Sequence, residues 1–323
     1  MKRYLALLMF ILCTACEKEE LAIEAHNINI IQSNQIDMGS DYSYQTFYNI
    51  ETNTIISQNL KTSWNLGFES KDDGWNIIIN SSVFSQISII ENNNFEDFSD
   101  LEDLDWQWDN PKGIFENTAI GDYRNLNDHF YVLDLGYDLN NNKVGYVKFK
   151  IDSVSSSSYY LTFSSLDDLQ LQTSTIAKDP DYNFIYYSFE SGDVIGVEPQ
   201  KNMWHLSFTQ YTHLFNEAST SSPYLVSGVY LNYLNDNLVA VDSTSNFSDI
   251  FFSDISRYSF LNYQNSIGYD WKNYDLQTAL YSIFTHKIFI IKTNSHKYFK
   301  FRFLDFYNDN GDKGYPLFEL QEL

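Results

Sequence analysis

Two stretches far apart in the chain share one residue pattern. The first reads FYNIETNTIISQNLKTSWNLGF at residues 47–68, and the second reads YYSFESGDVIGVEPQKNMWHLSF at residues 186–208. Each begins with an aromatic pair, reaches a Glu followed by Thr or Ser, and ends in Trp-x-Leu-x-Phe. The steps Thr52-Asn53 and Ser191-Gly192 predict hairpin turns at matching places. A recurring block of this kind indicates an internal repeat and constrains the architecture more than any single residue does.

A second pair of blocks recurs in the same order. Residues 146–166 (YVKFKIDSVSSSSYYLTFSSL) parallel residues 298–323 (YFKFRFLDFYNDNGDKGYPLFELQEL). Aromatic or apolar residues alternate with Lys or Arg, which predicts a strand with one solvated face followed by a hairpin. The repeats predict two related β units, residues 40–175 and 176–323, whose junction lies near the turn-forming stretch KDPDY at 178–182. The pattern is compatible with two separate cores and with one shared sheet.

The residue content supports an all-β fold class with an antiparallel, duplicated architecture. Tyr and Phe occur 25 times each, and such residues favour pleated, half-buried surfaces. The net charge of −23 leaves no basic footprint for nucleic acid and disfavours anionic lipid surfaces. The sequence lacks G-x-S-x-G, H-E-x-x-H and a phosphate-cradling glycine loop, so we expect no enzyme.

The N-terminus predicts export and lipidation. Lys2 and Arg3 precede the apolar run LALLMFIL at 5–12, which is too short to span a bilayer but suits a secretion signal. The following CTAC is typical of a bacterial lipoprotein cleavage site. We therefore expect residues 1–15 to be a signal peptide, Cys16 to carry the lipid, and residues 16–39 to form the tether. The alternative is a plain secretory signal cut nearby.

The tether begins with EKEE at 17–20, directly after Cys16. A Lys followed by acids at this place resembles the surface-export signal of Bacteroidetes lipoproteins. The expected location is the outer membrane, with the folded part anchored by lipid and facing the cell exterior.

The second unit resembles the HmuY-type haem-binding lipoprotein family of Bacteroidetes. The resemblance is carried by YYSFESGDVIGV at 186–197, WHLSF at 204–208 and the terminal block from Lys287 to Leu323. It extends more weakly to the first unit through SWNLGF and YVKFKID. The resemblance implies a non-catalytic, extracellular β protein that takes up haem and delivers it to an outer-membrane transporter. Any metal would then be iron held through haem.

The haem ligands of the best-studied branch do not carry over to this chain. That branch holds iron between two histidines in the segment after the Trp motif, but here no histidine lies between His213 and His286. The stretch GYDWKNYD at 268–275 places Tyr274 nearest to one of those positions. Haem iron accepts His, Met, Cys or Tyr, so the haem-binding candidates are the following residues: Met203, His205, His213, Tyr269, Trp271 and Tyr274.

His205 and Met203 are the weaker candidates. Residues two apart in a strand share a face, so the pair offers one iron ligand at most. The strand pattern predicts that Trp204, Leu206 and Phe208 face the core and that His205 faces away from it. Because Asn65 stands at the matching place of the first unit, His205 is expected to be a hydrogen-bonding position.

Two further expectations concern function and the acidic stretch. An alternative to haem uptake is a surface module of the same fold that has lost haem binding and binds carbohydrate or protein through exposed Tyr and Trp.

Residues 91–113 (ENNNFEDFSDLEDLDWQWDNPKG) predict a solvated insertion in which a helix could form.

Overall fold

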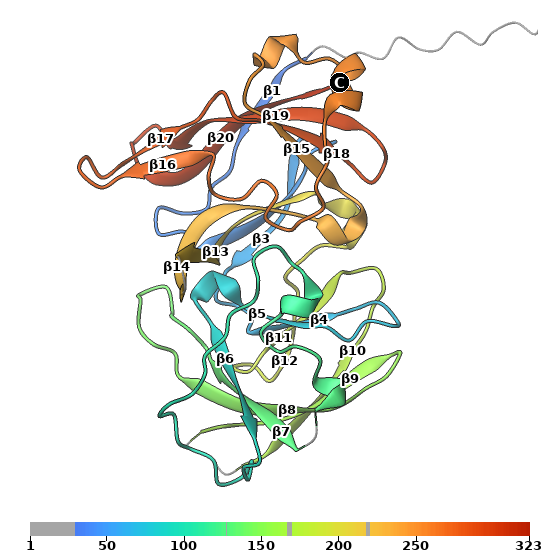
Figure 1. Cartoon of the computed structure of the whole chain (residues 1–323), viewed down its shortest axis with the longest axis vertical. Helices are drawn as coiled ribbons and strands as arrows, with labels where there is room; N and C mark the ends of the chain where they lie inside the picture. Colours follow the sequence, from blue (N-terminus) through green and yellow to red (C-terminus); the bar gives the residue numbers. More distant parts are fainter. Residues whose placement is uncertain (1–29, 127, 167–169, 218–219) are drawn as a thin grey trace, which may run out of the picture.

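The chain folds into β-strands joined by tight turns (Figure 1). The computed structural model describes residues 30–126, 128–166, 170–217 and 220–323; the lipidation site expected at Cys16 lies outside these ranges. Within them there is no α-helix, and none of the short helical turns is long and apolar enough to cross a membrane. The paired strands run antiparallel, which confirms the predicted all-β fold class.

The strands are short to medium in length. In chain order they are β1 (Gln32–Gln35), β2 (Tyr44–Asn49), β3 (Thr54–Leu60), β4 (Leu66–Glu69), β5 (Ile77–Ile79), β6 (Gln86–Glu91), β7 (His129–Asp134), β8 (Tyr146–Val154), β9 (Ser158–Ser165), β10 (Gln172–Ala177), β11 (Phe184–Ser188), β12 (Asp193–Ile195), β13 (Leu206–Glu217), β14 (Thr220–Leu231), β15 (Leu238–Asp242), β16 (Lys272–Asp275), β17 (Leu280–Ile283), β18 (Ile288–Lys292), β19 (Tyr298–Tyr307) and β20 (Lys313–Glu322). The predicted terminal hairpins are β8–β9 and β19–β20.

The strands form two bodies that follow one another along the long axis of the molecule (Figure 1). The upper body combines a sheet of order β1-β20-β19-β18-β15 with a sheet of order β14-β13-β2-β3. The lower body combines a sheet of order β10-β9-β8-β7-β6 with a sheet of order β12-β11-β4-β5. The hairpin β16–β17 is a separate two-stranded sheet that projects from the upper body.

Each predicted unit gives one hairpin to the other. Hairpin β2–β3, from unit 40–175, pairs with β13 in the upper body and places Tyr48 opposite Leu206. Hairpin β11–β12, from unit 176–323, pairs with β4 in the lower body and places Tyr187 opposite Leu66. These pairs match in the alignment of the two repeats. The bodies therefore have the same strand order, and neither is made from one predicted unit alone.

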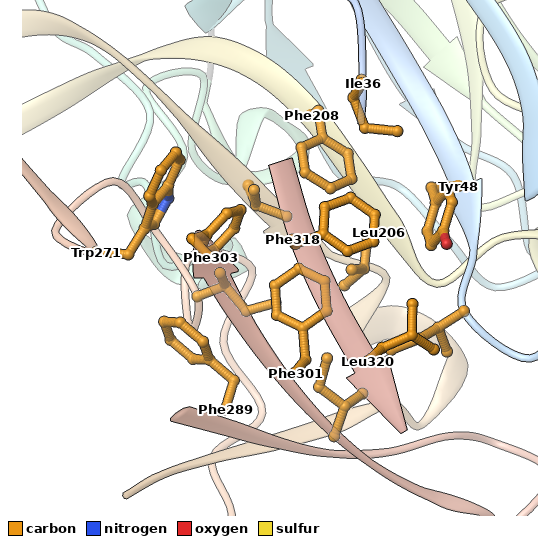
Figure 2. Close-up of a cluster of buried hydrophobic side chains, with 14 of the residues drawn as sticks. Ile36, Tyr48, Leu206, Phe208, Trp271, Phe289, Phe301, Phe303, Phe318 and Leu320 are labelled. Carbon is orange, nitrogen blue, oxygen red and sulfur yellow. The ribbon is translucent and has the colours of Figure 1, made fainter. Parts of the chain in front are cut away.

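Alternating aromatic residues build the core of the upper body (Figure 2). Along β19, Phe301 and Phe303 point inward, and their rings meet Phe318 of β20 at centroid distances of 4.7 and 6.4 Å. Phe318 also stacks on Phe208 of β13, so the two sheets of this body share one apolar layer. A separate apolar cluster fills the lower body around Phe68, Tyr131, Phe149, Tyr159 and Tyr187.

The two Trp residues of the repeats lie in the seam between the bodies. Trp204 packs edge-on against Phe47, and Trp64 packs in the same way against Tyr186, at centroid distances of 4.9 and 4.7 Å. Trp204 is therefore buried among apolar residues, as predicted, but in a different cluster from Leu206 and Phe208. β13 begins only at Leu206, so strand alternation does not apply to Trp204.

One lysine in each of the two repeated strands is buried, contrary to the predicted solvated face, while Lys150 and Arg302 remain partly exposed. Lys148 and Lys300 are 1% and 3% exposed. The Lys148 ammonium donates to the carbonyls of Glu96 and Phe98, and that of Lys300 donates to the carbonyls of Phe247 and Ile250. In each body a connecting loop covers this strand face and supplies backbone acceptors.

The acidic stretch 91–113 is irregular, and the helix that its sequence allowed does not form. Seven of its eight acidic residues are exposed, as predicted, whereas the Asp109 carboxylate points inward and accepts hydrogen bonds from the Ile79 and Ala119 amides. Its apolar residues also face inward. The residues packed against Phe130 and Val132 are Phe95, Phe98, Leu101, Leu104 and Trp106.

Candidate functional site

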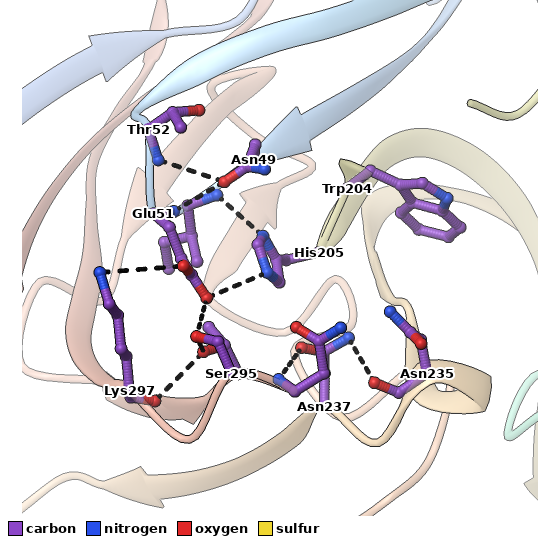
Figure 3. Close-up of polar contacts among 12 residues, drawn as sticks. Asn49, Glu51, Thr52, Trp204, His205, Asn235, Asn237, Ser295 and Lys297 are labelled. Atoms are coloured by element: carbon purple, nitrogen blue, oxygen red, sulfur yellow. Dashed lines mark hydrogen bonds and ion pairs between the residues drawn. The ribbon is translucent and has the colours of Figure 1, made fainter. Parts of the chain in front are cut away.

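His205 lies in a closed polar network rather than at a ligand site (Figure 3). Its side chain is buried, Nδ1 accepts a hydrogen bond from the Ile50 amide at 3.2 Å, and Nε2 lies 3.6 Å from Glu51 Oε1. Burial lowers the pKa of His205, and the Glu51 carboxylate opposes that shift. Ser295 and Lys297 complete the surroundings of Glu51. Both ring nitrogens thus face protein groups, as expected of a hydrogen-bonding position.

Met203 occupies a different surface from the other candidates. It ends the 3₁₀ turn Lys201–Met203 and is 47% exposed. Its carbonyl accepts a hydrogen bond from Asn49 Nδ2, which ties this turn to the exchanged hairpin β2–β3.

A pocket of about 480 Å³ opens between hairpin β13–β14 and hairpin β16–β17. Tyr269 and Tyr274, predicted from GYDWKNYD, both line it. Tyr274 is 42% exposed, and its ring packs against Tyr281 at 4.8 Å. The wall residues are Tyr42, Gln210, Phe215, Tyr224, Leu225, Val226, Ser227, Tyr269, Lys272, Asn273, Tyr274, Tyr281 and Lys313. Six of these side chains are aromatic, which suits a flat, largely apolar ligand.

His213 lies behind two residues of the pocket wall and does not line the pocket itself. Its ring contacts Phe215 and Tyr269 at centroid distances of 4.7 and 4.9 Å. Nδ1 is buried and has no hydrogen-bond partner among the described groups. Burial lowers the pKa of His213, and the Asp270 carboxylate opposes the shift. The half-buried ring thus has one ring nitrogen, Nδ1, that lacks a hydrogen-bond partner within the described ranges.

Trp271 belongs to the core and is not available to a ligand. It is 1% exposed, and its ring stacks on Phe303 at 3.7 Å with 12° between the ring planes. Its Nε1 donates to the Gly268 carbonyl at 3.2 Å. The structure thus separates Trp271 from Tyr269 and Tyr274, which the sequence grouped together.

Lys272 is a wall residue that sequence reasoning missed. Its side chain is 7% exposed, and Nζ donates to the carbonyls of Ser227 and Tyr269 at 2.5 and 3.5 Å. Within the described ranges it makes no ion pair, since the neighbouring Asp270 pairs with Lys287 at 2.6 Å. Burial lowers the pKa of Lys272 to about 7, and Asp270 opposes this shift.

The sequence contained a usable signal for Lys272. Residues two apart on a strand share a face, and β16 contains both Lys272 and Tyr274. Once Tyr274 is assigned to a pocket wall, Lys272 follows. Lys313 adds a second ammonium at the wall, 5.3 Å from the Tyr42 ring centroid.

Glu198 is a buried acid with a structural role. Its Oε1 accepts hydrogen bonds from the amides of Asn183 and Phe184 at 2.5 and 3.0 Å. Burial raises the pKa of Glu198 to about 8, opposed by these hydrogen bonds. Across the described ranges, His, Cys, Asp and Glu nowhere gather in a group of three or more that could hold a metal ion.

The pocket lies mainly in a segment with recognisable relatives. The family model of the HmuY protein matches residues 181–320. Over this segment the chain is similar to the HmuY family. The HmuY segment contains His213, Tyr269, Lys272 and Tyr274, whereas Tyr42 comes from the exchanged N-terminal part. No curated protein matches the chain.

Two solved structures are similar to the chain along most of its length. An apo HmuY analogue from Tannerella forsythia is 11% identical, and the alignment covers 92% of this chain and 98% of that one with a TM-score of 0.32. Apo PinO from Porphyromonas gingivitis is 7% identical, with coverage of 91% and 98% and a TM-score of 0.30. At these scores the HmuY assignment rests on the family model alone.

Proposed function

We propose that the chain is a non-catalytic surface lipoprotein that binds haem, or a related hydrophobic ring, in the pocket between β13–β14 and β16–β17. The observation that carries the proposal is a pocket wall with six aromatic side chains and two lysines, Lys272 and Lys313. Most of this wall lies in the segment that matches the HmuY family model. Haem is a flat aromatic ring with carboxylate groups, so it needs both apolar walls and cations. Lys272 lacks a carboxylate partner within the described ranges, and an unpaired buried ammonium is costly. A ligand carboxylate would supply that partner.

The residues present also fit the iron of haem. Tyr269 and Tyr274 offer phenol oxygens at the wall, and His213 offers the unpaired Nδ1 behind Tyr269. Tyrosine and histidine are both known axial ligands of haem iron. His213 and Tyr274 are the first residues to test as iron ligands. Trp271, Met203 and His205 have no ligand role in this proposal.

The test is an absorption titration of the lipid-free chain, residues 17–323, with haemin. We expect a shifted Soret band, and a different band position or intensity in His213→Ala or Tyr274→Phe. His286→Ala is the matched control because His286 is exposed and outside the pocket wall. Unchanged spectra in both ligand variants would reject both assignments, whereas the absence of any Soret shift in the unaltered chain would reject haem itself.

The second candidate is a carbohydrate- or protein-binding module on the same fold. Tyr224 is 64% exposed at the pocket mouth, and Gln210, Ser227 and Asn273 add polar groups beside the aromatic walls. Such a mixture also suits sugar rings. A chain that gives no Soret shift but binds a glycan array or captures a defined protein would favour this candidate.

The anchor and the transporter are part of the same proposal. Cys16 would hold the protein at the outer membrane, and an outer-membrane transporter would receive the ligand. In cells, Cys16→Ala should move the protein from the membrane fraction to the soluble fraction. Retention of the variant in the membrane fraction would reject lipidation at Cys16.

We infer in addition that the two halves derive from one duplicated unit and that only one of them holds the ligand. Asn80 Nδ2 donates to the carbonyls of Lys61 and Trp64, and Asn232 Nδ2 donates to those of Lys201 and Trp204. This equivalence supports a common origin. The pocket segment lies between β15 and β18, while its counterpart between β6 and β7 contains the acidic stretch in place of hairpin β16–β17. One haem per chain is the expected stoichiometry.

A further inference from the structure

An apolar groove of about 900 Å³ lies beside the first and last strands of the upper body and shares no lining residue with the ligand pocket. It is lined by Ile31, Phe251 and Phe252, together with Tyr298 and the C-terminal Leu323. Phe251 and Phe252 are 60% and 61% exposed, and Ile31 is 51% exposed. Soluble proteins seldom expose large apolar patches, and such patches usually mark an interaction surface.

The aromatic residues of the groove are held in place by the protein. The Phe251 amide donates to Asp254 Oδ2 at 2.8 Å, which fixes the start of the turn Phe252–Arg257. The buried ammonium of Lys300 donates to the carbonyl of Ile250, directly before Phe251. The Phe252 ring packs against Tyr298 at 5.8 Å. The turn is therefore tied to the sheet while both phenyl rings remain exposed to solvent.

The chain enters the upper body at this groove. β1 pairs with β20 and places Gln32 opposite Leu320, so Ile31 lies beside the C-terminal strand. The described chain begins at Ile30, which is 66% exposed. Thirteen residues, 17–29, lie between Cys16 and Ile30, and a fully extended segment between these two residues spans at most about 50 Å. A lipid on Cys16 would keep this end of the molecule near a membrane.

We propose that the occupant of this groove is the surface of the lipid bilayer, with Phe251, Phe252 and Ile31 inserted among the lipids. The inference rests on the proposed anchor. The charged residues that line the groove are of mixed sign: Lys300 is buried, and Lys297 Nζ lies 3.8 Å from Glu322 Oε1. The chain as a whole is acidic. Contact therefore depends on apolar insertion and not on attraction to anionic lipid. In this orientation the lower body points away from the membrane.

The test replaces the lipid with a defined attachment. Residues 17–323 carry an N-terminal hexahistidine and are bound to phosphatidylcholine vesicles that contain a nickel-chelating lipid. This part of the chain has no cysteine, so Phe251→Cys can be labelled at one place with an environment-sensitive fluorophore. Leu276→Cys is the matched control, because Leu276 is 88% exposed in the turn of hairpin β16–β17.

We expect the label at residue 251 to become brighter and blue-shifted on vesicles and to be quenched by spin-labelled lipid, while the label at 276 stays as in water. Identical behaviour of the two labels would overturn the proposal. A change at 251 that follows the surface density of protein and resists quenching by spin-labelled lipid would overturn it in favour of a second copy. The haemin titration of both labelled chains separates this failure from a failure of the proposed function.

Discussion

Asn65 and His205 make the same contact in the two bodies. Asn65 Oδ1 accepts a hydrogen bond from the Phe189 amide at 2.8 Å, and His205 Nδ1 accepts one from the Ile50 amide at 3.2 Å. Each amide belongs to the residue directly after the first strand of an exchanged hairpin. The residue between Trp and Leu thus secures the hairpin that arrives from the other unit.

This relationship predicts that His205→Asn is tolerated. Asn presents Oδ1 where His presents Nδ1, so the Ile50 amide keeps its acceptor. His205→Leu leaves that buried amide without a partner and should lower the free energy of unfolding by about 1–3 kcal/mol. Urea unfolding of the three proteins measures the difference. Equal losses for Asn and Leu would contradict the acceptor role.

The exchanged hairpins predict which fragments fold. Residues 176–323 alone lack β1, β2 and β3, so β13 and β20 each lose one of their two partners in the upper body. We expect this fragment to aggregate or to lack a cooperative unfolding transition. A chain that joins residues 30–60 to 204–323 through a flexible linker contains every strand of the upper body and should fold. Far-UV circular dichroism and thermal unfolding compare the two, and a folded 176–323 fragment would contradict the exchange.

Lys272 predicts a pH dependence of stability in the ligand-free protein. Burial lowers the pKa of Lys272 from 10.5 to about 7, so the unfolded chain binds more protons between these values. The contribution of Lys272 to the free energy of unfolding should therefore rise with pH through this window and stay constant below pH 7. Between pH 7 and pH 9 the rise should be on the order of 1–2 kcal/mol relative to Lys272→Met.

Paired urea titrations of the unaltered chain and of Lys272→Met measure this difference directly. The acidic residue nearest to Lys272 in the chain, Asp270, pairs with Lys287 and is present in both proteins. Parallel pH profiles for the two proteins would show that Lys272 does not titrate in this range.

Replacing the buried Lys300 should lower the free energy of unfolding more than replacing a surface lysine. Its ammonium satisfies the carbonyls of Phe247 and Ile250 under the loop that covers β19. Lys300→Met should lower the free energy of unfolding by about 2–3 kcal/mol, because these carbonyls lose their charged donor. Lys112→Met is the control, since Lys112 is exposed. Similar losses in both variants would contradict the account of the buried lysine.

The turns and strands could be predicted because their signals are local. Asn53 and Gly192 have φ values of 53° and 66°, and Asn and Gly are the residues that adopt this left-handed backbone readily. The exchange of hairpins could not be predicted in the same way. Periodicity identifies a strand and its faces but not the strand that will pair with it, and two similar repeats offer equivalent partners.

The site was only partly predictable for a related reason. Tyr269 and Tyr274 line the pocket, but the neighbouring Trp271 is in the core because its ring stacks on Phe303. Phe303 is remote in sequence, so no local pattern distinguishes these aromatic residues. Lys272 was overlooked because a lysine in a strand usually faces solvent, whereas the loop around Tyr269 covers this one.

In the proposed function, one aromatic pocket with Lys272 at its wall binds haem. A Soret titration of residues 17–323 with haemin, repeated with Lys272→Met, tests it most directly. We expect a Soret shift that saturates at one haem per chain and a weaker affinity in the variant. A chain that shows no Soret shift at micromolar haemin would contradict the claim.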